Sequence, residues 1–153
     1  MTRAYLAFTE KGLALAQKLA SALPGTVARC GHGGPGLADW AAEQFAHADA
    51  LIFVGAVGIA VRAIAPHCQN KAVDPAVVVL DECGHFAVPI LSGHLGGAND
   101  LARALAAVCG AVPVITTATD ANGVFAVDAW ARHQNCAVLE PERIKRVSSR
   151  LLA

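Results

Sequence analysis

A chain of 153 residues has the size of one ordinary domain, which argues against two complete domains. With 55% hydrophobic and 16% charged residues, the composition excludes intrinsic disorder and predicts a well-filled core. The 12 basic residues balance the 12 acidic ones and only 5% of residues are aromatic, so we expect no nucleic-acid partner.

The sequence also predicts a protein of the cytoplasm without a membrane partner. No apolar run is long enough to cross a bilayer, and no signal-type hydrophobic stretch follows Met1. The five cysteines are odd in number, scattered and free of CxxC pairs, which is typical of reduced thiols and not of a disulfide framework.

The first half of the chain alternates predicted strands with predicted helices. Strands are expected over residues 3–8, 26–30 and 50–54, and helices over residues 11–23, 38–48 and 59–64. Glycine-rich loops follow two of these strands, at residues 31–36 and 55–58. Each strand therefore leads into a helix, as in a parallel sheet.

The second half predicts a hairpin and then a more helical end. Strands over residues 76–81 and 86–91 are joined by a tight turn containing Gly84, and a third glycine-rich loop spans residues 92–100. A helix over residues 101–108, a strand over 112–115 and helices over 128–134 and 142–152 complete the chain.

These elements predict an α/β fold, a mostly parallel sheet flanked by helices in a Rossmann-like three-layer arrangement, with a helical C-terminal extension. We place the α/β domain at residues 1–119 and the extension at residues 120–153. Because ligands of such sheets bind outside the carboxyl ends of the strands, the three glycine-rich loops are expected to share one edge.

The loop after the third strand is suited to an anion. Gly55 and Gly58 lie between a strand and a helix, where backbone N–H groups and the helix dipole favour phosphate or carboxylate, and Arg62 follows one turn later. The segment is neither a Walker A motif nor a dinucleotide fingerprint. Glycines that serve only close strand-to-helix packing remain an equal alternative.

The loop over residues 92–100 is the strongest candidate for chemistry. We expect His94 to act as general base or acid, with Asp100 as its orienting group or as an alternative base. The Gly96 and Gly97 amides are expected to stabilise an oxyanion, and Ser92 and Asn99 to contact substrate. Ser92 is not in a GxSxG elbow. The alternative is that Asn99 or Asp100 only caps the following helix.

Two further groups of residues are candidate ligand sites. Thr117 and Asp120 follow the strand over residues 112–115 and are candidate substrate contacts, with helix capping as the alternative. Cys83 and His85 could meet His94 across the hairpin, but this set lacks a known metal-ligand spacing. We therefore expect no metal site.

Five segments in order resemble the CbiG family of cobalamin biosynthesis, the cobalt-precorrin 5A hydrolases. They are FVGAVGIAVRAIAPH, DPAVVVLDECGHF, LSGHLGGANDLA, PVITTATD, and VDAWARH together with PERIKRVSSRLL. The resemblance runs through nearly the whole chain and is looser in the first fifty residues. It implies that residues 120–153 lead to a further C-terminal domain, absent from this chain, that completes the protein in cis or in trans.

The resemblance implies hydrolysis of the ring A δ-lactone of cobalt-precorrin 5A, with release of acetaldehyde and formation of cobalt-precorrin 5B. Cobalt arrives in the substrate, so no separate cofactor is implied. Two alternatives stay open: a tetrapyrrole-binding fragment without turnover, and a small α/β protein that binds a nucleotide or phosphate. The oligomeric state is not determined by the sequence.

Overall fold

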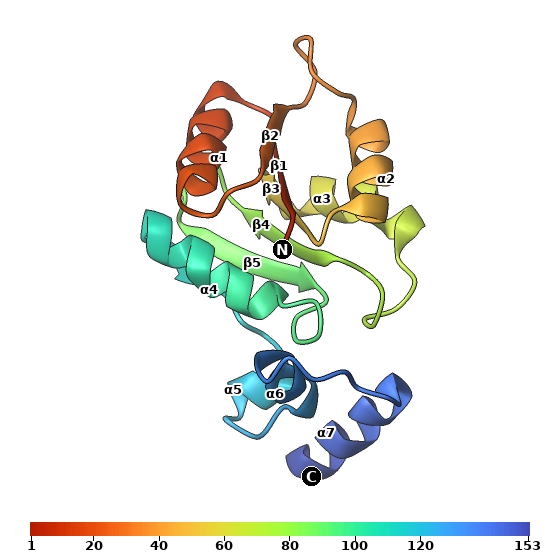
Figure 1. Ribbon diagram of the computed structural model, residues 1–153. Helices are drawn as coiled ribbons and strands as arrows, with labels where there is room; N and C mark the ends of the chain where they lie inside the picture. Colours follow the sequence, from red (N-terminus) through yellow and green to blue (C-terminus); the bar gives the residue numbers. More distant parts are fainter.

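Four parallel strands form one side of the six-stranded sheet in the computed structural model, which describes residues 1–153 (Figure 1). They are β1 (Arg3–Ala7), β2 (Thr26–Arg29), β3 (Ala50–Val54) and β4 (Ala76–Leu80), and the full strand order is β2-β1-β3-β4-β5-β6. Every residue of β3 and β4 is buried, because helices cover both faces of the sheet.

Two pairs of helices form the outer layers (Figure 1). Helices α1 (Glu10–Ala22) and α4 (Ala98–Cys109) cover one face, where Leu19 and Leu105 enter the core. Helices α2 (Leu37–His47) and α3 (Val57–Ile64) cover the other face and bury Trp40 against Phe53. Helix α3 ends at Ile64 and is followed by a short 3-10 turn, η1 (Ala65–His67), which contains Pro66. The prediction of a three-layer α/β fold is confirmed.

Strands β5 and β6 run opposite to the other four. β5 (Phe86–Leu91) pairs antiparallel with β4, so that Leu91 lies beside Val77 at the start of β4. The short β6 (Val112–Pro113) pairs parallel with β5. We call the end of the sheet where β1 to β4 terminate the carboxyl edge and the opposite end the amino edge. The segments that follow β5 and β6 therefore lie at the amino edge.

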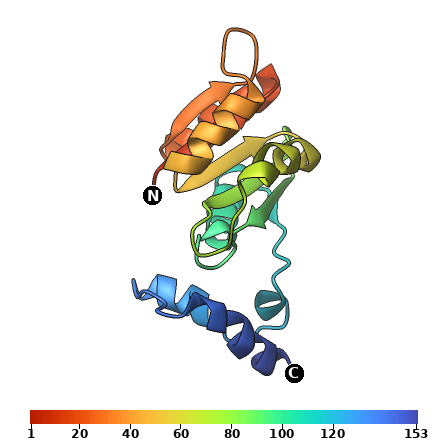
Figure 2. The same cartoon turned by 90° about the vertical axis from the view of Figure 1, so that its right-hand side faces the viewer.

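Three helices follow the sheet and lie below its amino edge (Figure 2). They are α5 (Ala118–Ala121), α6 (Val127–His133) and α7 (Ile144–Leu152), with the 3-10 turn η2 (Pro141–Arg143) before the last. Helices α5 and α6 pack against α7, which buries Ile144. We call residues 118–152 the helical segment. None of the helices combines the length and the apolar character that crossing a bilayer requires.

Several expected element boundaries differ from the structure by one to three residues, and the short helix α5 is not among the expected elements. Helix α4 begins at Ala98, three residues earlier than expected, because Gly97 adopts a left-handed conformation (φ 83°) and turns the chain directly into the helix. No side chain caps this helix, so the interpretation of Asn99 or Asp100 as its cap is wrong. The last strand ends at Pro113, two residues earlier than expected.

Candidate functional site

The three glycine-rich loops do not share one edge of the sheet, so that prediction is wrong. The loops at residues 31–36 and 55–58 follow β2 and β3 at the carboxyl edge. Residues 92–97 follow β5, whose antiparallel direction carries them to the amino edge. A five-residue strand is about 16 Å long, so the sheet separates the loops by a distance of that order.

The loop after β5 folds on itself before α4 begins. The Ser92 hydroxyl is buried and donates to the Asp74 carbonyl at 3.0 Å, and the backbone of Ser92 has a φ of 56°. The Gly97 N–H donates to the His94 carbonyl at 3.0 Å. The Ser92 hydroxyl and the Gly97 amide are therefore engaged with other groups of the chain, whereas the Gly96 N–H makes no hydrogen bond within the chain.

The His94 side chain is held between two carboxylates. Its Nε2 lies 2.5 Å from Asp120 Oδ2, and its Nδ1 lies 3.0 Å from Asp128 Oδ1. The hydrogen bonds with Asp128 and Asp120 raise the pKa of His94 above its usual value, against the opposite effect of burial. Both ring nitrogens are engaged, so in this arrangement the imidazole has no free nitrogen for a proton from water.

Asp120 connects His94 to the polar residues expected to act with it. Thr117 donates to its Oδ2 at 2.6 Å, and Arg103 donates to its Oδ1 at 3.0 Å. The amide of Asn99, 3% exposed, donates to Thr117 at 3.0 Å and to Asp120 at 3.4 Å. Burial would raise the pKa of Asp120, but hydrogen bonds from Thr117, His94 and Arg103 outweigh it and lower the pKa to about 2.

Asp100 does not orient His94, contrary to expectation. Its carboxylate accepts hydrogen bonds from Arg132 at 2.9 Å and His133 at 2.6 Å, both from α6, and from Arg103 at 3.3 Å. Asn99 and Asp100 are neighbours on α4 and project about 100° apart around the helix axis, so Asn99 contacts Thr117 and Asp120 whereas Asp100 contacts α6. Asp120 occupies the place beside His94 that the sequence interpretation gave to Asp100.

Asp128 and Arg132 are functional candidates that the sequence interpretation missed. Asp128 is 2% exposed, and its carboxylate also lies 3.5 Å from Lys71 Nζ. Burial would raise the pKa of Asp128, but His94 and Lys71 outweigh it and lower the pKa. The only sequence signal was their i, i+4 spacing, which places both residues on one face of a helix.

These contacts join the helical segment to the rest of the molecule through charged side chains. The pairs are His94–Asp120, His94–Asp128, Lys71–Asp128, Arg103–Asp120, Arg132–Asp100 and His133–Asp100. We call this set the polar joint. The guanidinium of Arg132 lies directly over Gly97, where a Cβ atom would collide with it.

Two grooves open beside the polar joint at the amino edge. One has a volume of about 420 Å³ and includes Leu95 and Gly96 in its lining, together with Phe45 and Asp74. The other, of about 460 Å³, shares Phe45 and Asp74 and reaches His67. Gly96, whose N–H is unpaired, therefore lines a surface that is concave and partly apolar.

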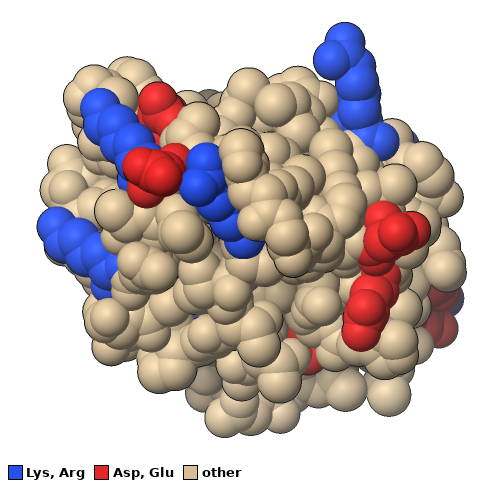
Figure 3. Space-filling view, turned by 90° about the horizontal axis from the view of Figure 1, so that it is seen from above, with Lys and Arg blue, Asp and Glu red and all other residues tan.

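The carboxyl edge has a smaller crevice of about 310 Å³. Phe8, Thr9, Gly55, Asp81 and Glu82 contribute to its lining. It lies between the ends of β1 and β3. Strands β2 and β3 lie on opposite sides of β1, so the order of the strands reverses here, and such a reversal is the usual ligand position in α/β sheets. Figure 3, which shows the molecule from above, has Lys, Arg, Asp and Glu side chains scattered over a mostly uncharged face.

The anion-binding interpretation of the carboxyl edge is only partly supported by the backbone. The Gly55 N–H is engaged with the Leu80 carbonyl at 2.8 Å, whereas the N–H groups of Val57 and Gly58 make no hydrogen bond within the chain. Arg62 is exposed on α3 and forms no ion pair. These residues are separated from His94 by the length of the sheet.

The possible metal set of Cys83, His85 and His94 does not form. Cys83 and His85 lie in the β4–β5 turn at the carboxyl edge, whereas His94 lies beyond the other end of β5. This separation is the result of the same antiparallel strand that divides the glycine-rich loops.

Comparisons with known proteins converge on one family. Residues 39–120 match the family described as Cobalamin synthesis G N-terminal. A cobalt-precorrin-5A hydrolase of Salmonella typhimurium is 46% identical over 144 residues, which covers 86% of this chain and 40% of that protein. A protein of the same name from Priestia megaterium is 42% identical over 99 residues, covering 65% of this chain and 26% of that protein. The chain thus spans less than half the length of these relatives.

A solved structure supports the fold. The crystal structure of a cobalamin biosynthesis protein G homologue from Sulfolobus solfataricus matches 99% of this chain and 46% of that chain, with a TM-score of 0.64 and 24% identity. The family match includes His94, Asp100 and Asp120 and ends before Asp128 and Arg132.

Proposed function

This chain belongs to the Cobalamin synthesis G N-terminal family, and from that premise we propose that it acts in the hydrolysis of cobalt-precorrin 5A. The observation that carries the proposal is the 46% identity with the Salmonella hydrolase across 86% of this chain. Since that relative is longer, the active protein is expected to include residues beyond those of this chain.

The proposed reaction has two steps that need proton transfer. Water adds to the carbonyl carbon of the ring A δ-lactone, and the ester C–O bond breaks to leave a carboxylate and a hydroxyl group on C20. Loss of the C20 hydroxyl proton then breaks the carbon–carbon bond and releases C20 with its methyl group as acetaldehyde, while the electron pair of that bond stays on the macrocycle, which takes up a proton. One base that works near neutral pH serves both steps.

We assign this base to His94, with Asp120 as its orienting carboxylate. A carboxylate bound to one imidazole nitrogen fixes the ring orientation and leaves the other nitrogen to exchange a proton. Asp128 now occupies that second nitrogen, at 3.0 Å from Nδ1. Withdrawal of α6 would free Nδ1 and remove the hydrogen bond that contributes most to the raised pKa of His94. The resting arrangement is therefore a closed form.

The groove lined by Leu95 and Gly96 is the proposed position of the macrocycle edge. The free Gly96 N–H is available for a developing oxyanion. Arg103 and Arg132, which the polar joint pairs with Asp120 and Asp100, are the cations that we assign to peripheral carboxylates once the joint opens. A groove of about 420 Å³ accommodates one edge of a large ring and not the whole ring. Gly55, Gly58 and Arg62 have no part in this site, because they lie at the other edge.

Binding of a tetrapyrrole without turnover is the second candidate function. It is favoured by the engagement of both His94 nitrogens, which leaves no free base in the closed form. The nucleotide or phosphate alternative loses support, because Asp81 and Glu82 line the carboxyl-edge crevice and the Gly55 amide is engaged.

The experiment that tests the proposal is acetaldehyde release from cobalt-precorrin 5A. It is run on this chain and on the chain fused to the remaining part of the Salmonella relative. Turnover in either form supports hydrolysis. Binding of the substrate without acetaldehyde in both forms would replace hydrolysis with the second candidate.

A further inference from the structure

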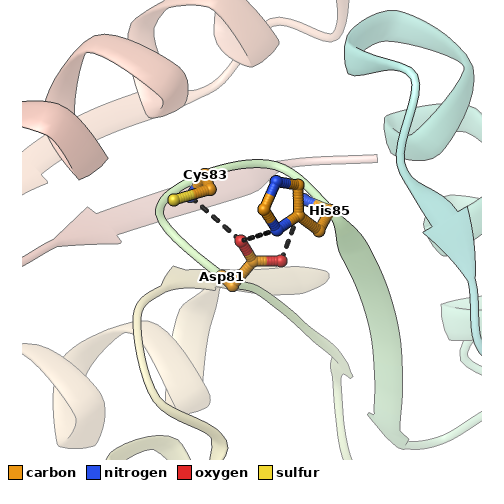
Figure 4. A group of neighbouring side chains, drawn as sticks. All are labelled: Asp81, Cys83 and His85. Carbon is orange, nitrogen blue, oxygen red and sulfur yellow. Dashed lines mark hydrogen bonds and ion pairs between the residues drawn. The ribbon is translucent and has the colours of Figure 1, made fainter.

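Three side chains of different chemistry converge in the β4–β5 turn at the carboxyl edge (Figure 4). The ligand atoms of Asp81, Cys83 and His85 all lie within 4.8 Å of one another. His85 Nδ1 is 3.8 Å from Asp81 Oδ1. A carboxylate, a thiol and an imidazole are the three kinds of side chain that bind zinc and related divalent ions in proteins.

The turn holds the carboxylate in a fixed orientation. Asp81 Oδ1 accepts the Cys83 N–H at 3.0 Å, and Oδ2 accepts the N–H groups of His85 at 2.9 Å and Phe86 at 2.8 Å. Gly84 has a φ of 69°, and this left-handed conformation brings Cys83 and His85 to the same side of the turn. One ligand is thus already positioned, while the side chains of Cys83 and His85 are exposed.

We propose that Asp81, Cys83 and His85 bind one divalent transition metal ion, of the zinc or cobalt type. Ligand atoms of a tetrahedral zinc or cobalt site are about 3.3–3.8 Å apart, as follows from bonds of about 2.0–2.3 Å. The three atoms here need to approach by only about 1 Å, which exposed side chains achieve by rotation. A water molecule would complete the coordination, as in sites with three protein ligands.

The position of this set beside a crevice is an independent observation. Asp81 belongs both to the metal set and to the lining of the crevice at the end of β1 and β3. That crevice is where ligands bind in sheets of this kind. The metal site is separate from the polar joint, so the proposal does not depend on hydrolysis.

Lys11 is the one group that opposes the metal. Its Nζ lies 3.1 Å from Cys83 Sγ, so the ammonium group of this α1 residue donates a hydrogen bond to the sulfur. A metal ion must either displace this ammonium group or share the sulfur with it. Lys11→Met removes the competing cation and is expected to tighten metal binding.

Cobalt(II) is the direct probe, because a cobalt–thiolate bond gives a charge-transfer absorption that carboxylate and imidazole ligands do not give. The metal-free chain, kept reduced, is titrated with Co²⁺ and then with Zn²⁺ as competitor. We expect one equivalent to bind with the thiolate band, and Cys83→Ser to abolish the band. His85→Ala should weaken binding by more than roughly tenfold. Cys136→Ser, at another exposed cysteine, is the matched control and should bind as the unsubstituted chain does.

The outcomes that overturn the proposal are equally defined. They are the absence of the thiolate band in the unsubstituted chain, an unchanged band in Cys83→Ser, or an equal loss in Cys136→Ser. Cys83 and His85 are exposed, so their substitution should leave the fold intact. Thermal unfolding of the variants is the measurement that checks this.

Discussion

The two edges of the sheet use polar groups in different ways. At the amino edge, His94, Asp100, Asp120 and Asp128 are all paired with charged or hydrogen-bonding side chains. At the carboxyl edge, an open crevice adjoins unpaired N–H groups at the start of α3 and the exposed Cys83 and His85.

This difference teaches that a dense cluster of polar residues in a sequence need not be a free reactive site. Six polar residues between positions 92 and 120 form hydrogen bonds and ion pairs with one another and with the helical segment. They are His94, Asn99, Asp100, Arg103, Thr117 and Asp120. If the proposed hydrolysis is correct, the amino edge carries the chemistry only after this joint opens. The following predictions test that distinction.

The largest effect is expected from His94→Ala. If His94 is the base, acetaldehyde release should fall by on the order of a hundredfold to ten-thousandfold, with substrate binding little changed. Asp100→Asn is the matched control, because Asp100 lies in the same joint without touching His94, and it should keep near-normal turnover. An unchanged rate in His94→Ala would remove the reaction from this loop.

A loss of stability is expected from Asp128→Ala. The substitution removes a buried carboxylate that accepts from His94, which should lower the free energy of unfolding by about 2 kcal/mol in urea titrations. Asp100→Ala, at a partly exposed ion pair, should cost less than about 1 kcal/mol. Because Asp128 blocks Nδ1, turnover should survive in Asp128→Ala. Loss of turnover as severe as in His94→Ala would contradict the closed-form interpretation.

The stability of the polar joint should depend on pH in a bell-shaped manner. The carboxylates of Asp120 and Asp128 have lowered pKa values in the folded state. Their contribution to the free energy of unfolding is therefore fully present above the pKa of the unfolded state, near 4. It is lost as the pH falls through the pKa of the folded state, which is about 2 for Asp120. His94 has a raised pKa, so its contribution is present below about 6.5 and is lost as the pH rises through the folded value.

The joint should therefore be most stable between about pH 4 and 6.5. Urea titrations across the pH range measure the profile, and His94→Ala should remove its alkaline limb. An alkaline limb that persists in His94→Ala would assign it to another group.

The smallest effect on turnover is expected from Gly55→Ala. Its Cβ would lie 2.7 Å from Phe8 Cδ2, so the ring must move within the carboxyl-edge crevice. Gly58→Ala is the control, because nothing lies within 4 Å of its added Cβ. Both variants should release acetaldehyde at near the normal rate. A strong loss in Gly55→Ala alone would move the substrate to the carboxyl edge.

Much of the fold was predictable because local patterns were unambiguous. The apolar run over residues 50–54 is β3 as expected, and the Gly84 turn joins an antiparallel pair as expected. The start of helix α4 was predicted three residues too late, because Ala98 and Asn99 look like loop residues in the sequence. The structure shows that Gly97 turns the chain into the helix and that Asn99 donates a hydrogen bond to Thr117.

The sequence by itself determined the alternation of strands and helices, the apolar core and the family, because these depend on periodicity and on residues close together in the chain. It also indicated that His94 lies among polar residues. Only the tertiary structure decided which residues pair with it. Asp120 and Asp128 are 26 and 34 positions away, and they reach His94 because β5 runs antiparallel and delivers its loop to the edge beneath which the helical segment folds. The direction of one strand thus placed His94 at the opposite end of the sheet from Gly55, a long-range consequence that no local pattern carries.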